Sequence, residues 1–66
     1  MKVVVNGESR NLREGATVAD LVRELILEGR PIAVELNRQV VPRGEFPGQP
    51  LADGDRVEVI HIVGGG

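Results

Sequence analysis

A single helical pattern, between residues 17 and 29, constrains the fold of this chain more than any other feature. Apolar residues recur there at the spacing of one helix face: Val18, Leu21, Val22, Leu25 and Ile26. Thr17 is a suitable N-cap with Asp20 three residues later, and Gly29 followed by Pro31 is expected to end the helix. A helix with one apolar stripe needs one other layer to cover it, so the remaining chain must supply a sheet.

The rest of the chain has the pattern of short strands separated by turns. We expect strands at residues 2–5, 8–12, 32–36, 39–41 and 56–62. Asn6-Gly7 predicts a type I′ hairpin, and Asn37-Arg38 predicts a second short turn. Residues 43–50 hold two prolines and two glycines, which predicts a loop anchored by Phe46, with Leu51 tucked under the domain.

These elements predict an α+β fold of order ββαββ, with a mixed four- to five-stranded sheet and one helix packed on one face. This is the β-grasp arrangement, in which the first and last strands lie side by side and the C-terminal tail is expected to leave from the sheet's edge. A chain of 66 residues makes one domain. We therefore expect a β-grasp domain at residues 1–63 and a flexible glycine tail at residues 64–66.

Size and composition favour a binding or carrier protein over an enzyme. A domain this small cannot enclose a deep active site. The net charge of −2 argues against nucleic acid, and the sequence has no polybasic segment or long apolar run for a membrane. The sequence has no cysteine, which favours a reducing, cytoplasmic setting and leaves no side-chain thiol to carry sulfur.

The most informative functional feature is the ending, Gly64-Gly65-Gly66, directly after the apolar run 57–63. Glycine has no side chain, so a thread of glycines can enter a narrow channel and present its last carboxylate for chemistry. Fraying or a cloning scar is the alternative interpretation.

Alternation in the last strand directs Val57 and Val59 to the core and Ile60 and Ile62 to the outer face of the sheet. Two isoleucines beside the tail favour a docking surface, although scattered surface apolar residues or a bulge would explain them too. His61 falls on the core side, beyond the cover of the helix. It has no second histidine or cysteine for a zinc site, so we expect no metal.

Several motifs together resemble the ThiS-type sulfur carriers of thiamin thiazole biosynthesis, which are ubiquitin-like β-grasp proteins. The resemblance covers the whole chain and rests on these segments: Asn6-Gly7, Gly15–Val18, Asp20–Val22, Val34–Asn37, Val40–Arg43, Asp53–Glu58 and Val63–Gly66. The chain departs from the family at Phe46-Pro47, where members often have tryptophan.

The resemblance implies a sulfur shuttle that is not itself an enzyme and binds no cofactor. An E1-like enzyme would use MgATP to adenylate Gly66, and sulfur drawn indirectly from a cysteine desulfurase would convert it to a thiocarboxylate. A thiazole synthase would then take the sulfur. Gly64 and Gly65 would enter the partner's active site, and Ile60, Ile62 and Val63 would contact the partner.

Three alternatives remain open at this point. The first is a carrier of the same fold for molybdopterin synthesis or tRNA thiolation. The second is a ubiquitin-like covalent protein modifier, although Lys2 is the only lysine, which disfavours chains built on itself. The third is an interaction module with an inert tail.

Overall fold

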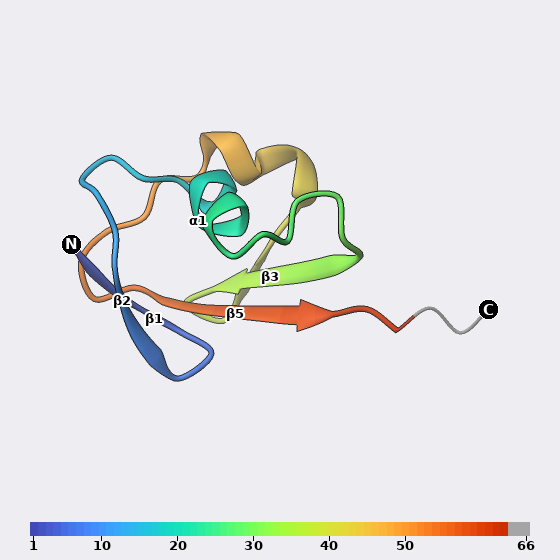
Figure 1. The fold of residues 1–66 in the computed structure, drawn as a ribbon, viewed down its shortest axis with the longest axis horizontal. Helices are drawn as coiled ribbons and strands as arrows, with labels where there is room; N and C mark the ends of the chain where they lie inside the picture. The colour runs from blue at the N-terminus through green and yellow to red at the C-terminus, as the bar shows by residue number, and fades with distance from the viewer. Residues whose placement is uncertain (64–66) are drawn as a thin grey trace.

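The computed structural model describes residues 1–63, which form a mixed five-stranded sheet with two helices on one side of it (Figure 1). The elements follow in this order: β1 Lys2–Val5, β2 Glu8–Asn11, α1 Val18–Glu24, β3 Ile32–Leu36, β4 Gln39–Val41, the 3₁₀ helix η1 Arg43–Gly48, and β5 Arg56–His61. The predicted α+β fold, with one α-helix on one face of a mixed sheet, is confirmed. Neither helix is long and apolar enough to cross a membrane.

The strand order is β2-β1-β5-β3-β4. β1 and β5 are neighbours, as predicted, and they run parallel with Val4 opposite Arg56. β3 pairs antiparallel with the other edge of β5. The prediction that the chain end leaves from the sheet's edge is therefore wrong, because β5 is the central strand and uses both of its hydrogen-bonding edges. The last described residues continue outward from the middle of the sheet (Figure 1).

Both predicted hairpin turns form with the backbone that a type I′ turn requires. The φ angles are 48° and 84° at Asn6 and Gly7, and 50° and 72° at Asn37 and Arg38. A turn with two positive φ angles matches the right-handed twist of the strands it joins. The turns therefore fix the registers of β1 with β2 and of β3 with β4.

The helix begins as predicted but ends one turn early. Thr17 and Asp20 form a complete capping box. At the other end, the N–H of Leu27 donates to the carbonyl of Val22, and the N–H of Ile26 donates to Arg23, both at 3.0 Å. These two bonds are a Schellman motif, in which the residue after the C-cap adopts a left-handed conformation.

That residue is Ile26, with a φ of 59° and 81% of its surface exposed. The predictions that Ile26 belongs to the apolar stripe and that Gly29 ends the helix are therefore wrong. Leu27 packs against the core after the chain has reversed. The Schellman geometry thus lets Leu27 pack, partly buried, against the core, in keeping with the hydrophobic contact that often accompanies this motif.

One core lies between the sheet and the two helices. Its members are apolar and at most 7% exposed: Val3, Val5, Leu12, Ala16, Val18, Leu21, Val22, Ile32, Val34, Val41, Phe46, Leu51, Val57 and Val59. The predicted roles of Phe46 and Leu51 as buried anchors are confirmed. Burying side chains of this size contributes about 1.5–3 kcal/mol each, so the core gives β5 a fixed position.

Candidate functional site

Side chains near the end of β5 point alternately to the core and to an exposed apolar face of the sheet. Val57 and Val59 are buried, whereas Ile60 and Ile62 are 46% and 52% exposed. Ile60 lies opposite Ala33 of β3, whose small side chain leaves the isoleucine standing above the sheet. The predicted outward orientation of Ile60 and Ile62 is confirmed, while their role in docking stays a prediction.

The chain is held once more before it leaves the sheet. The N–H of Ile62 donates to the carbonyl oxygen of Pro31 at 2.8 Å, one residue past the end of β5. The guanidinium of Arg43 braces the same segment by donating to the carbonyls of Arg30 and Ile32. Val63, the last residue described, is 91% exposed. Ile62 is therefore the last described residue that the sheet holds, and Val63 projects into solvent.

Asn6 holds β5 from the other side. Its side-chain oxygen accepts the N–H of Val59 at 2.8 Å, and its side-chain nitrogen donates to the Val59 carbonyl at 3.3 Å. β1 ends at Val5, so the asparagine side chain continues the pairing for one more step along β5. The sequence predicts only a turn at Asn6, because nothing local indicates which strand will lie beside it.

The outer face also carries two acids directly opposite each other. Glu35 of β3 faces Glu58 of β5, next to the Ala33–Ile60 pair. Like charges directly opposite on neighbouring strands are destabilising. Within residues 1–63 neither carboxylate forms an ion pair. The face beside the chain end is thus apolar nearest the end and acidic further back.

His61 lies exposed on the helix side of the sheet, beyond the cover of α1, as predicted. It lines a shallow hollow together with Asn6, Leu25, Leu27 and Val59. The part of the chain that the structure describes has no cluster of three potential metal ligands.

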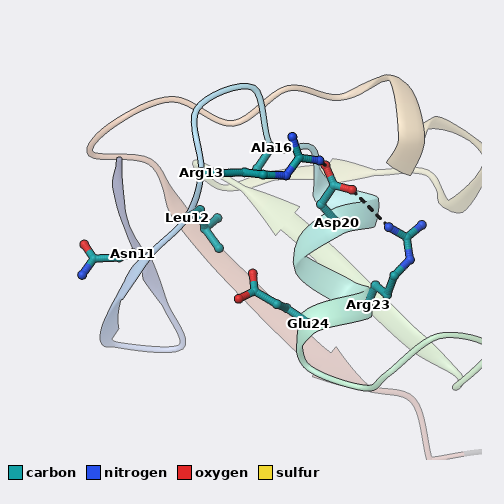
Figure 2. A pocket seen from close by; sticks show the side chains of 7 residues that line it. All are labelled: Asn11, Leu12, Arg13, Ala16, Asp20, Arg23 and Glu24. Carbon is teal, nitrogen blue, oxygen red and sulfur yellow. Dashed lines mark hydrogen bonds and ion pairs between the residues drawn. The ribbon is translucent and has the colours of Figure 1, made fainter.

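A second hollow lies between the N-terminal part of α1 and the segment after β2 (Figure 2). The Asp20 carboxylate sits between Arg13 at 3.0 Å and Arg23 at 3.2 Å. The backbone N–H of Thr17 is the largest cause that lowers the pKa of Asp20. Burial opposes it as the second-largest effect, and the Thr17 hydroxyl, Arg13 and Arg23 each add a smaller lowering. These charged groups pair with one another, which indicates a structural role in capping the helix.

The structure thus brings three of the predicted site residues, Ile60, Ile62 and Val63, to one end of the domain. The other three, Gly64, Gly65 and Gly66, lie outside the described residues. Asn6 and Pro31 fix where the chain leaves the sheet, and neither is recognisable as a site residue from the sequence. Both act through tertiary contacts, so only knowledge of the strand order could have found them.

Comparison with known proteins gives consistent matches. The ThiS family model matches residues 3–66. The chain is 42% identical over 64 residues to the sulfur carrier protein ThiS of Thermus thermophilus, which covers 97% of this chain and 98% of that protein. A crystal structure of the thiamine biosynthesis protein ThiS from Geobacter metallireducens superposes with a TM-score of 0.86 at 33% identity, covering both chains completely.

The chain also matches a larger protein. It is 41% identical over all 66 residues to a thiazole synthase of Paramagnetospirillum magneticum, of which it spans 20%. The first curated relatives are thus about five times as long as the matched region. The family model and the full-length carriers nevertheless match nearly the whole chain, and the fold is theirs. The chain belongs to the ThiS family of sulfur carrier proteins.

Proposed function

We propose that this domain carries sulfur for thiazole formation in thiamine biosynthesis, on the carboxylate of Gly66. The observation that carries the proposal is the exit of the chain from the sheet. Ile62 is anchored to Pro31, Val63 is 91% exposed, and three glycines follow in the sequence. A rigid domain that presents an unbranched end is suited to deliver that end into another protein's active site.

The chemistry requires activation, because a carboxylate is a poor electrophile. In the proposed first step, a carboxylate oxygen of Gly66 attacks the α-phosphorus of MgATP on an E1-like partner enzyme, and pyrophosphate leaves. A persulfide supplied through a cysteine desulfurase then attacks the acyl-adenylate carbonyl, and AMP leaves. A thiol cleaves the S–S bond of the resulting acyl disulfide, which leaves the thiocarboxylate on Gly66 and a disulfide on the other product.

The domain contributes no catalytic group to these steps. We propose that Gly64 and Gly65 pass through the narrow part of the partner's channel, since a side chain there would widen the thread. Ile60, Ile62 and Val63 are proposed to contact the partner around the channel mouth. We propose that the reaction takes place in the cytoplasm, because the absence of cysteine favours a reducing compartment.

The comparisons favour thiazole synthesis over the other sulfur-transfer pathways. Two similar proteins are thiazole synthases in which the matched region is 20% of the length. A carrier-like region within a synthase supports the proposal that this domain also delivers sulfur to a thiazole synthase.

The experiment is the intact mass of the protein isolated from its own cells, without strong reductant or alkali. We expect a fraction in which one oxygen is replaced by one sulfur, on a chain that ends at Gly66. This fraction should fall when the thiazole synthase is active and rise when that synthase is deleted. The matched control is a chain with Gly65 and Gly66 deleted, which should show no sulfur.

Other outcomes contradict the proposal. Conjugates to other proteins would indicate a covalent modifier. An unmodified end in every condition would indicate an interaction module. Accumulation of sulfur that does not respond to the synthase would assign the carrier to another pathway.

A further inference from the structure

We infer that the fold keeps the chain's only side-chain amine away from the activated end, so that the acyl group stays available to an external nucleophile. The inference rests on the proposed function for its biological meaning. It concerns Lys2, which carries the only side-chain amine in the 66-residue sequence. An amine within reach of an acyl-adenylate would form an amide, and sulfur could no longer enter.

The strand order places Lys2 at the opposite end of the sheet from the chain's exit. β1 runs parallel to β5, with Val4 opposite Arg56, so Lys2 is level with Gly54. Two hydrogen bonds confirm that Lys2 lies beside Gly54. The Lys2 N–H donates to the Asp53 carboxylate at 2.7 Å, and the Gly54 N–H donates to the Lys2 carbonyl at 2.8 Å.

The separation exceeds what the tail can span. Eight residues separate the level of Gly54 from Ile62, about 26 Å along an extended strand. Ile62 is held by its bond to Pro31, so only the four following residues can turn back, and they reach at most about 14 Å. The remaining gap is about 12 Å, whereas a lysine side chain spans only about 6 Å.

The reaction that is avoided is an ordinary acyl transfer. The Lys2 amine would attack the Gly66 carbonyl, a C–N bond would form, the bond from carbon to the leaving oxygen would break, and AMP and a proton would leave. The product would be a cyclic chain lighter by one water than the free acid. An antiparallel arrangement of β1 and β5 would bring Lys2 to the exit end, so the parallel pairing is the feature that protects the tail.

Arginines at both ends of the sheet allow a matched test that conserves charge. Arg30 is exposed and precedes Pro31, the residue that anchors Ile62. Arg38 is exposed in the turn at the other end, two residues beyond the Leu36–Val57 pair. Neither side chain forms an ion pair within residues 1–63. Arg30→Lys therefore puts an amine within the tail's reach, and Arg38→Lys puts the same amine out of reach.

The experiment activates the Gly66 carbonyl as a thioester, without any partner enzyme. Each 66-residue protein is produced as a C-terminal thioester by intein cleavage with a small thiol and incubated at micromolar concentration and mildly alkaline pH. Intact mass distinguishes the hydrolysed acid from the cyclic amide. We expect the Arg30→Lys protein to form at least about ten-fold more cyclic product than the wild type or Arg38→Lys, because a tethered amine has a millimolar effective concentration.

Two results would overturn the inference. One is cyclisation of the wild type or of Arg38→Lys at a rate similar to that of Arg30→Lys. The other is a lack of cyclic product from a correctly folded Arg30→Lys protein, which would mean that distance does not control self-acylation. No activating enzyme takes part in this test, so its failure would not argue against the proposed sulfur transfer. Conversely, an unmodified C-terminus in the cell would count against the proposed function but not against this inference.

Discussion

The side-chain amide of Asn6 forms two hydrogen bonds with the backbone of Val59, one to its N–H at 2.8 Å and one from its nitrogen to the carbonyl at 3.3 Å. The two residues are 53 positions apart in the chain. The amide replaces a strand where β1 has ended, and so it holds the part of β5 that leads to the exit. A turn residue thereby also sets the position of the proposed sulfur-carrying end.

Substitution of Asn6 by alanine should destabilise the domain by about 1–3 kcal/mol, because it leaves backbone groups of Val59 without their partners and places alanine at a positive φ. Urea unfolding measures the effect. Asn6→Gly is the control, since it tolerates the φ of 48° but also lacks the amide. If Asn6→Gly is as stable as the wild type, the two hydrogen bonds contribute nothing.

Substitution of Ile26 by glycine should stabilise the domain by about 0.5–1 kcal/mol. A left-handed conformation costs an L-residue roughly 1–2 kcal/mol, and glycine recovers most of this against its larger loss of backbone entropy. Little burial is lost, since Ile26 is 81% exposed. The thermal midpoint should rise for Ile26→Gly and stay nearly unchanged for Ile26→Ala. A fall in the thermal midpoint of the glycine variant would contradict the conclusion that the left-handed backbone at Ile26 is strained.

The lowered pKa of Asp20 predicts how stability depends on pH. The charged carboxylate caps α1, so its contribution is fully present above its ordinary pKa of 3.8 and is lost as pH falls through the lower pKa of the folded state. Asp20→Asn should therefore be less stable than the wild type at neutral pH, and the difference should shrink in acid. Urea midpoints measured across this range test the sign. Glu24→Gln, in the same hollow and outside the ion pairs, is the matched control.

Replacement of Ile60 by glutamate should weaken binding to the activating enzyme by at least about ten-fold, because it places a charge in the proposed contact surface. The fold should persist, since the side chain is 46% exposed. Val40→Glu is the matched control, because Val40 is 68% exposed on the same face but lies on the edge strand β4. Titration calorimetry with the partner compares them. Equal affinities of the two variants would exclude Ile60 from the contact.

Replacement of Gly65 by valine should leave the unfolding midpoint unchanged and reduce adenylation about 100-fold or more, since misplacement of a reacting group costs on this order. Pyrophosphate release with the partner enzyme and MgATP is the readout. Gly44→Val adds the same side chain where the surroundings of the Cβ are open, so it should behave as the wild type. Normal adenylation of Gly65→Val would rule out a narrow channel.

Local pattern alone was sufficient for much of the fold. Thr17 and Asp20 start the helix where predicted, and Asn6-Gly7 has the expected positive φ angles. A turn forms at Asn37-Arg38 as predicted, and the alternation along β5 places Ile60 and Ile62 outside. These features depend on residues a few positions apart. The interactions that produce them lie within a short segment, so a single sequence is enough to predict them.

Tertiary structure decided the rest. The chain end leaves from a central strand because β5 pairs with both β1 and β3. The helix stops before Ile26 because Leu27 reaches the core when the chain reverses. The bonds from Asn6 to Val59 and from Ile62 to Pro31, and the distance of Lys2 from the exit, all follow from which strands become neighbours. Strand neighbours are chosen by contacts between distant segments, which no local pattern encodes.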